Sequence, residues 1–537
     1  MRRSIFKSSI LLLCGLASAF ICLSSYAAAK KPNILYIMSD DHAAHAIGAY
    51  GGRLSGLNPT PTLDLLAQQG TLFTRVFTTN SICTPSRASV LTGQYSQTNG
   101  VLDLFGSLPS EQQYLPQAMK KAGYQTAIIG KWHLKQEPGA FDYYKVLASQ
   151  GTYFDPEFRV RGPKPWPKNT VTYRGHSSDI IANQGLDWLY NERDKSKPFM
   201  LMLQFKAPHD MFEYAPQYEY YLHDTTIPEP TDLYQRTETF GSIATRGENG
   251  ALESVIGTSV SKRNFRRNMG QHMGVSQDLD DTAYTKESYQ RYLKAYLRCV
   301  KGVDDNIARV ITELKKMGEW DNTVIIYTAD QGFMLGEHDF IDKRWMYDES
   351  MRMPFIVRYP GKEKAPGKSD LLINNTDFAP FIIDIAGGKI PAQMQGKSFA
   401  SVLDGKTPKN WRTATYYRYW MHRAHHDVPA HFGIRDERYK LILFYGVHYE
   451  ENAPEFYDRK FVQGGGENRV AVSTPAAWEL YDLKNDPNEL NNVYGDKKYA
   501  DVVVKLKKEL IRQRKLYNET DKNYPHIDKV VKAAWNH

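Results

Sequence analysis

The sequence has few cysteines and, after its first 29 residues, no long apolar segment. Only four cysteines occur among 537 residues, and two of them, Cys14 and Cys22, lie near the N-terminus. The other two, Cys83 and Cys299, are too sparse for a disulfide scaffold in a chain of this length. No internal repeat is present, and no tract has the composition of a disordered region. We therefore expect a globular protein without a disulfide framework, a repeat array or several membrane spans.

Residues 1–29 are typical of a secretory signal peptide. A positive start is formed by Arg2, Arg3 and Lys7. An apolar stretch at 10–23 follows, and then small residues that end at Ala29. Because a membrane span needs about 20 apolar residues, we expect a cleaved leader, no span in the mature protein, and export to the periplasm or the extracellular space. A retained anchor and a lipoprotein attached at Cys14 or Cys22 are the alternatives.

The net charge is mildly positive. The leader holds three basic residues and no acidic residue, so the mature chain carries +5 instead of the +8 of the whole sequence. This balance suits an anionic substrate. Lysine and arginine are not clustered as densely as nucleic-acid recognition requires, so no nucleic-acid partner is expected.

Short apolar segments alternate with helical patterns over the first three quarters of the chain. The apolar segments, typical of strands buried on both faces, are 33–38, 126–129, 199–205, 323–328 and 354–359. The helical patterns are 61–69, 114–121, 179–191 and 289–317. This alternation predicts an α/β fold with a large mixed, mostly parallel sheet flanked by helices.

The pattern changes after about residue 410. Further strand-like segments are 413–420, 432–435, 439–445 and 478–483, and an amphipathic helix follows at 498–517. We therefore expect a catalytic domain at 30–410 and a smaller subdomain at 411–537, an antiparallel sheet with a helix packed on it. The weakly patterned residues 151–286 predict elaborated loops near the site, interrupted by one strand and one helix.

Polar side chains follow four of the predicted parallel strands. They are Asp40 and Asp41 after the first, Lys131 and His133 after the second, His209 after the third, and Asp330 and Gln331 after the fourth. A buried core would place nothing polar there. In sheets of this kind, ligands bind beyond the carboxyl ends of the strands. These side chains therefore predict a site at one edge of the sheet.

Cys83 lies in a motif that carries a family resemblance. The motif is Cys83-Thr84-Pro85-Ser86-Arg87, followed by Leu91-Thr92-Gly93. It resembles the signature of the type I sulfatases of the alkaline phosphatase superfamily, Cys/Ser-x-Pro-x-Arg followed by Leu-Thr-Gly. The resemblance extends from about residue 32 to the final helix. It implies an enzyme that removes O-sulfate from a sulfated carbohydrate.

The resemblance also implies a modified nucleophile. In the family, maturation machinery oxidises the cysteine to formylglycine (3-oxoalanine), and the hydrated aldehyde attacks sulfur. Its second hydroxyl then loses a proton, expels sulfate and restores the aldehyde, which a serine could not do. In the family, the arginine at the position of Arg87 lies against the oxygens of the nucleophile.

The implied metal site consists of Asp40, Asp41, Asp330 and Gln331, together with the nucleophile at Cys83. These oxygen ligands suit a hard divalent cation, with Ca²⁺ preferred over Mg²⁺. The last ligand is most often asparagine in the family. Gln331 departs from that form but still offers an amide oxygen.

The remaining positions imply a sulfate clamp and proton carriers. Lys131 and Lys343 match the lysines that neutralise sulfate oxygens. His133 matches the histidine that contacts the nucleophile, and His209 matches the general acid that protonates the leaving alkoxide. His338, Arg344 and Trp345 are further candidates for contact with the substrate.

Two other functions stay open at this point. One is a phosphatase or phosphonate monoester hydrolase of the same superfamily, since fold does not determine chemistry. The other is a non-catalytic protein that binds polyanions. Residues 330–343 resemble those of carbohydrate sulfatases, including glucosamine-6-sulfatase-like ones, so sulfated sugar is the favoured substrate.

Overall fold

The computed structural model describes residues 30–234, 238–246, 273–362, 365, 367–424, 428–451, 473–519 and 521–536. The predicted leader at 1–29 lies outside these ranges. Residues 32–537 form one compact unit. Within the described part of the chain, no helix has both the length and the apolarity required to cross a bilayer.

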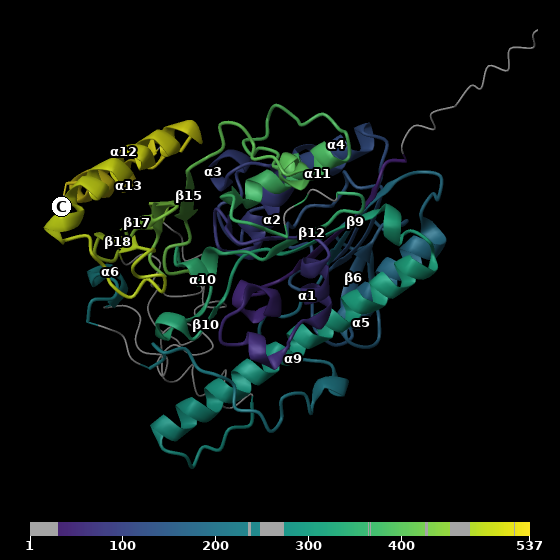
Figure 1. The fold of residues 1–537 in the computed structure, drawn as a ribbon, viewed down its shortest axis with the longest axis horizontal. Helices are drawn as coiled ribbons and strands as arrows, with labels where there is room; N and C mark the ends of the chain where they lie inside the picture. The colour runs from purple at the N-terminus through teal and green to yellow at the C-terminus, as the bar shows by residue number, and fades with distance from the viewer. Residues whose placement is uncertain are drawn as a thin grey trace, which may run out of the picture. The chain divides into compact units, whose positions relative to one another are not determined.

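A mixed sheet of ten strands is the centre of this unit (Figure 1). The strands in spatial order are β13 (Lys368–Ser369), β2 (Thr71–Phe73), β12 (Phe355–Arg358), β9 (Thr323–Ala329), β1 (Asn33–Ser39), β8 (Phe199–Gln204), β4 (Gln125–Gly130), β5 (Tyr143–Leu147), β6 (Glu157–Val160) and β7 (Thr170–Thr172). From β9 to β5 all neighbours are parallel. The predicted fold class, a large mixed and mostly parallel sheet with flanking helices, is confirmed.

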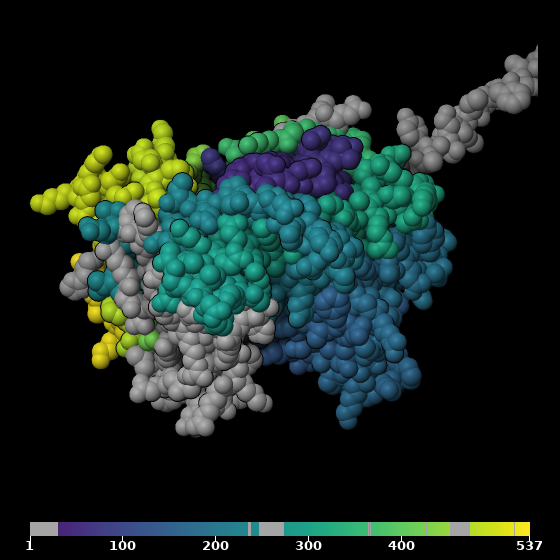
Figure 2. Space-filling view, turned by 90° about the horizontal axis from the view of Figure 1, so that it is seen from below, coloured from purple at the N-terminus to yellow at the C-terminus, as the bar shows by residue number. Residues whose placement is uncertain are grey.

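Helices cover both faces of the sheet. One face carries α1 (Pro61–Gln68), α5 (Ser177–Asp187) and α9 (Asp281–Lys316), and the other carries α2 (Cys83–Thr92), α4 (Tyr114–Lys121) and α11 (Phe378–Ile385) (Figure 1). Strand β1 shows why, because successive side chains point to opposite faces: Leu35 and Ile37 join the first core, whereas Ile34 and Tyr36 join the second. Seen from below, the teal-green surface of the α9 region lies beside blue surface from the part of the chain that includes α5 (Figure 2).

A second, antiparallel sheet of four strands follows in the C-terminal part. Its strands in order are β15 (Ala414–Tyr419), β16 (His431–Asp436), β17 (Tyr439–Phe444) and β18 (Ala477–Asp482). Two helices, α12 (Ala500–Leu516) and α13 (Pro525–Ala534), pack on it and are drawn in yellow in Figure 1. Leu506, Leu510 and Ile527 of these helices share a core with Phe432 and Leu441 of the sheet. The small antiparallel sheet with a terminal helix is as predicted, and α13 is an addition.

Further short α-helices and strands lie outside the two sheets and the helices that cover them. They are β3 (Val76–Phe77), α3 (Ser96–Asn99), α6 (Ile243–Arg246), β10 (Met334–Leu335), β11 (Ile341–Asp342), α10 (Asp348–Met351) and β14 (Ile373–Asn374).

The structure differs from the sequence-based prediction within residues 151–286 and at the start of helix α9, among other places. Residues 151–286, expected as loops with one strand and one helix, also contain β6 and β7, which extend the sheet in antiparallel fashion. Helix α9 begins at Asp281 instead of 289, and the Asp280 side chain caps it by accepting a hydrogen bond from the Ala283 N–H at 2.9 Å. Both additions are half-exposed and polar, so they lack the apolar periodicity that marks a buried element.

Candidate active site

The polar segments predicted at strand ends meet at one edge of the sheet. They follow β9, β1, β8 and β4, which are adjacent and parallel, so their carboxyl ends lie side by side. The contacts are direct. The Asp41 N–H donates to Asp330 Oδ1 at 3.1 Å, Lys131 pairs with Asp40, and Lys343, which follows β11, pairs with Asp41.

Cys83 begins helix α2 and faces this cluster. The helix starts with Pro85 in its first turn and ends at Gly93, whose φ of 64° only glycine adopts without strain. Cys83 is 1% exposed, and its Sγ lies 3.2 Å from Nδ1 of His133. The Thr84 hydroxyl lies 3.2 Å from the same nitrogen. Residue 83 therefore occupies the positive end of a helix dipole and touches a histidine.

The unmodified thiol is a poor nucleophile in this setting. Burial raises the pKa of Cys83 to about 11, although the charges of Lys343 and Arg87 act to lower it. A thiol with such a pKa is protonated at neutral pH, and only the thiolate attacks. The surroundings of Cys83 therefore fit a residue that acts after chemical conversion.

Arg87 lies one helical turn after Cys83 and holds three neighbours of the site in place. Its Nε donates to Asp330 Oδ2 at 3.0 Å, and its Nη1 donates to the Lys131 carbonyl at 3.0 Å and to Gln204 Oε1 at 2.6 Å. Arg87 thus links helix α2 to the ends of β9, β4 and β8.

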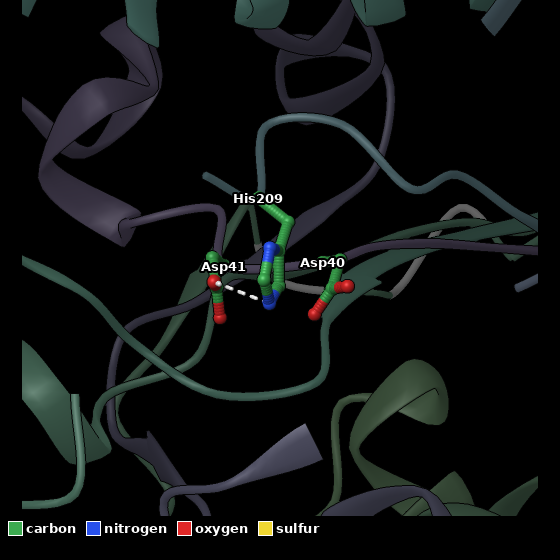
Figure 3. Close-up of side chains that lie close together, drawn as sticks. All are labelled: Asp40, Asp41 and His209. Atoms are coloured by element: carbon green, nitrogen blue, oxygen red, sulfur yellow. Dashed lines mark ion pairs between the residues drawn. The ribbon is translucent and has the colours of Figure 1, made fainter. Parts of the chain in front are cut away.

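The four proposed oxygen ligands lie together and are buried. Asp40, Asp41 and His209 each offer an atom within 4.8 Å of the others, and Figure 3 shows the His209 ring directed between the two carboxylates. Gln331 donates its amide N–H to Asp41 Oδ1. Burial raises the pKa of Asp41 to about 7, against the lowering effect of Lys343. Charges packed this closely need cations to balance them.

Two oxygens of this group lack a hydrogen-bond donor. Asp40 Oδ1 and Gln331 Oε1 are completely buried, and neither accepts a hydrogen bond from the described residues, although Arg87 Nη2 lies 3.9 Å from Asp40 Oδ1. A buried acceptor without a donor is costly, and carboxylate and amide oxygens are what Ca²⁺ and Mg²⁺ bind. The donor set therefore fits a divalent cation.

The lysines and His133 occupy the same cluster. Burial lowers the pKa of Lys131 well below its usual value, and burial together with the Lys131 charge does the same for His133. For Lys343, the neighbouring Asp41 and Asp342 outweigh burial and raise the pKa. Both lysines lie beside the buried carboxylates of Asp40 and Asp41, where an anionic group would meet them.

His209 follows β8 and points into the cluster. Its Nε2 lies 3.7 Å from Asp41 Oδ2, the ion pair dashed in Figure 3. Burial lowers the pKa of His209 to about 3, and the Asp210 carboxylate opposes that shift. An anionic substrate beside the ring favours the protonated form.

The three substrate-contact candidates, His338, Arg344 and Trp345, lie in the segment that follows β9. His338 is stacked between Phe240 and Tyr347, and its Nε2 lies 3.2 Å from Glu349 Oε2. Arg344 pairs with Asp342, and Trp345 stacks on Phe340 with ring centroids 4.9 Å apart. Each of these three residues is 2% exposed. Their contact with a substrate stays a prediction.

Three residues at the site were not predicted from the sequence. Gln204 receives a hydrogen bond from Arg87, the Tyr153 hydroxyl donates to the His209 carbonyl, and Asp210 contacts the His209 ring. Gln204 and Asp210 do carry a signal, since both lie at the polar end of the β8 segment. Tyr153 carries none, because it belongs to the weakly patterned region.

Gly130 sets the position of Lys131 and His133, and its replacement by alanine should damage both stability and activity. Its φ is +103°, and a Cβ there would lie 1.9 Å from the Gln204 carbonyl oxygen, which accepts the Lys131 N–H at 2.8 Å. Gly130→Ala should lower the free energy of unfolding by about 2–4 kcal/mol. Urea unfolding and sulfate-release kinetics measure the two effects.

Gly162→Ala is the matched control for that variant. Gly162 has open space around its Cβ position and no positive φ, so its replacement should leave both measurements unchanged. If Gly130→Ala were as stable and active as Gly162→Ala, close approach of β4 and β8 would not be needed to hold the site.

Two protein-family models match most of the chain. A model described as Sulfatase matches residues 32–388. A second, described as N-sulphoglucosamine sulphohydrolase, C-terminal, matches 336–463 and 471–516. The matched regions together contain every residue of the site.

Individual relatives agree with that assignment. The chain is 37% identical to an N-acetylglucosamine-6-O-sulfatase of Bacteroides thetaiotaomicron over 534 residues, 93% of this chain and 88% of the relative. A solved structure of a protein in complex with its substrate, D-glucosamine-2-N,6-O-disulfate, matches with a TM-score of 0.78 at 36% identity, over 92% of this chain and 99% of that one. A phosphonate monoester hydrolase from Silicibacter pomeroyi matches with a TM-score of 0.63 at 22% identity, over 92% and 96% of the two chains, which shows a shared fold alone.

Proposed function

The chain belongs to the sulfatase family, and from that premise we propose that it hydrolyses the 6-O-sulfate ester of glucosamine-type sugars. One observation carries the proposal: Cys83, its contact His133 and the two lysines surround a buried carboxylate pair at a single sheet edge. The substrate rests on the names of the relatives, an N-acetylglucosamine-6-O-sulfatase and a protein bound to a glucosamine disulfate.

Cys83 is the position of the nucleophile in this proposal. Oxidised to formylglycine by maturation machinery, as in the family, it supplies a hydrated aldehyde whose oxygens attack sulfur and later release sulfate. His133 is the group in reach of its proton, since Nδ1 lies 3.2 Å from Sγ. The raised pKa of the bare thiol supports conversion, because the unmodified residue would be inactive.

The metal would be held by Asp40, Asp41, Asp330 and Gln331. A divalent cation there, Ca²⁺ in preference to Mg²⁺, supplies positive charge that stabilises an oxygen nucleophile and balances the carboxylates. The unpartnered oxygens of Asp40 and Gln331 support this assignment. Lys131 and Lys343, which pair with Asp40 and Asp41 in this structure, would then be released to hold the sulfate oxygens.

His209 donates the proton that the sugar oxygen needs when the sulfur–oxygen bond breaks. A sugar alkoxide is a poor leaving group, so protonation matters more for it than for a phenol. The ring is directed at the same carboxylates as the other groups, which puts the acid and the nucleophile at one reacting centre.

Sulfate release from defined substrates tests the proposal. The protein, produced in a host with the oxidising machinery, should release sulfate from N-acetylglucosamine 6-sulfate at least about tenfold faster in kcat/KM than from the 3-sulfate. An aryl sulfate and an aryl phosphate compared side by side test the reaction class. Faster phosphate release would favour the phosphonate hydrolase alternative.

Calorimetry separates catalysis from mere binding. Heat of binding to a sulfated oligosaccharide, with no sulfate released by correctly matured protein, would favour the non-catalytic alternative. Matured protein should instead release stoichiometric sulfate from the sulfated sugars that it binds.

The organisation of the chain is part of the same proposal. We infer a cleaved leader at 1–29 that directs export to the periplasm or beyond, where sulfated polysaccharide is accessible. We also infer a catalytic domain at 30–410 and a C-terminal subdomain at 411–537, supported by the antiparallel sheet that starts at Ala414. Mass spectrometry of the mature N-terminus tests the leader.

A further inference from the structure

His209 is paired with the residue that follows it, and this pair carries an inference beyond the assignment of the acid. The His209 Nδ1 lies 2.6 Å from Asp210 Oδ1 and 2.8 Å from the Asp210 carbonyl oxygen. We propose that Asp210 is a positioning residue, which fixes the orientation and tautomer of His209 so that Nε2 delivers the proton to the leaving oxygen. The inference rests on the proposed function and adds to it the residue on which the acid depends.

The main chain around His209 is held independently of Asp210. The Tyr153 hydroxyl donates to the His209 carbonyl, and the His209 N–H donates to the Lys206 carbonyl at 3.1 Å. Lys206 is itself buried and its ammonium lies 5.0 Å from the centre of the Tyr153 ring. These contacts locate the backbone and involve no atom of the imidazole, so the ring takes its orientation from a partner of its own nitrogens.

Asp210 supplies that partner and thereby decides which nitrogen faces the reaction. Both oxygens near Nδ1 are acceptors, so the proton shared with them must lie on Nδ1. Nε2 is then the nitrogen on the side of Asp40 and Asp41, as Figure 3 shows. A histidine oriented in this way by a carboxylate presents one defined nitrogen to its substrate.

The proton transfer is balanced without further components. As the nucleophile's oxygen bonds to sulfur, the bond from sulfur to the sugar oxygen breaks, and the sugar oxygen keeps the bonding electron pair and takes the proton from Nε2. The Nδ1 proton stays shared with Asp210 throughout, so the carboxylate orients the ring and stabilises its charged form without being protonated itself. After the alcohol has left, Nε2 regains a proton through solvent, which balances the proton that the nucleophile's hydroxyl releases when it attacks.

Leaving-group dependence is the measurement that separates this role from a structural one. Asp210→Asn should lower kcat for N-acetylglucosamine 6-sulfate about 10–100-fold, with KM within about threefold. With 4-nitrophenyl sulfate, whose leaving group needs little protonation, the loss should stay under about threefold. In a series of aryl sulfates with increasingly basic leaving groups, kcat should therefore fall more steeply with leaving-group pKa for Asp210→Asn than for the wild type.

The chain offers a matched control for this variant. His223 and Asp224 form the same sequential pair, with Nδ1 and Oδ1 2.7 Å apart, and the Asp224 side chain is 96% exposed. Asp224→Asn should leave every rate unchanged. Asp210→Ala, which removes the side chain without adding an amide donor, serves as a second variant, and thermal unfolding of each variant verifies the fold.

Each outcome of the series has a separate meaning. Equal losses for good and poor leaving groups would overturn the inference, because a residue that supports the metal ligands or the fold slows all substrates alike. Unchanged rates in both variants would overturn it as well. A wild type that cleaves aryl sulfates but not the sugar sulfate would contradict the proposed substrate, and the role of Asp210 could still be tested with the aryl sulfate series. A matured wild type that cleaves no sulfate ester would refute both the proposed function and the role of Asp210.

Discussion

Replacement of Cys83 by alanine should lower the turnover of sulfate esters at least about 10⁴-fold and leave the fold intact. The expected loss is large because the residue proposed to supply the attacking oxygen begins helix α2 beside His133, and alanine leaves no group at that position that could be converted. The structural cost is small, about 1–2 kcal/mol, since only one buried sulfur is removed. Sulfate release and circular dichroism measure the two effects.

Cys299→Ala is the control for that loss. Cys299 lies within α9, is buried like Cys83, and belongs to the core between that helix and the sheet. Its replacement should leave kcat unchanged. Substantial activity in Cys83→Ala, or an unaltered thiol at residue 83 in active protein analysed by mass spectrometry, would contradict the assignment of the nucleophile.

The central strands could be predicted because a strand that is buried on both faces has a nearly continuous apolar sequence. β1, β8 and β9 are continuous apolar segments in which every residue is buried, and no turn or surface helix produces such a pattern. Their polar ends were equally clear, since a polar residue directly after a buried segment has to be explained.

The edges of the sheet could not be predicted for the opposite reason. β6 and β7 are short and partly exposed, and β2 has only three residues. Segments of this length offer one or two alternations, which loops produce as often. Their pairing is decided by neighbours far along the chain, and no local pattern reports those neighbours.

The residues of the site could likewise be predicted in part, but the contacts between them could not. The cysteine motif predicted the nucleophile and identified the family, and the strand ends predicted the edge of the sheet where the other polar groups gather. Which groups touch could not be known, because Lys131 and Asp40 lie 91 residues apart and Lys343 and Asp41 lie 302 apart. Even Asp210, next to His209 in sequence, was missed, since its contact depends on how the chain turns after β8.

Removal of divalent cations should inactivate the enzyme at least about 100-fold, and Ca²⁺ should restore activity better than Mg²⁺. The physical reason is the buried carboxylate group: Lys131 contacts Asp40 and Lys343 contacts Asp41, and a cation that balances the two carboxylates would leave the lysines available for sulfate. Kinetics after dialysis against EDTA, followed by titration with each cation, measures the effect.

Thermal stability provides an independent measurement of cation binding at the same site. A cation that binds only the folded protein stabilises it by about 2.7 kcal/mol at a free concentration 100 times Kd, so Ca²⁺ should raise the Tm of the wild type after dialysis. Asp40→Asn keeps the shape of the side chain but removes one charge, and should abolish both activity and this shift. Asp321→Asn, whose parent side chain is 93% exposed, should retain both. Full activity after dialysis, with no shift on adding Ca²⁺, would mean that the two lysines alone neutralise these carboxylates, and the unpartnered oxygens of Asp40 and Gln331 would then need a different explanation.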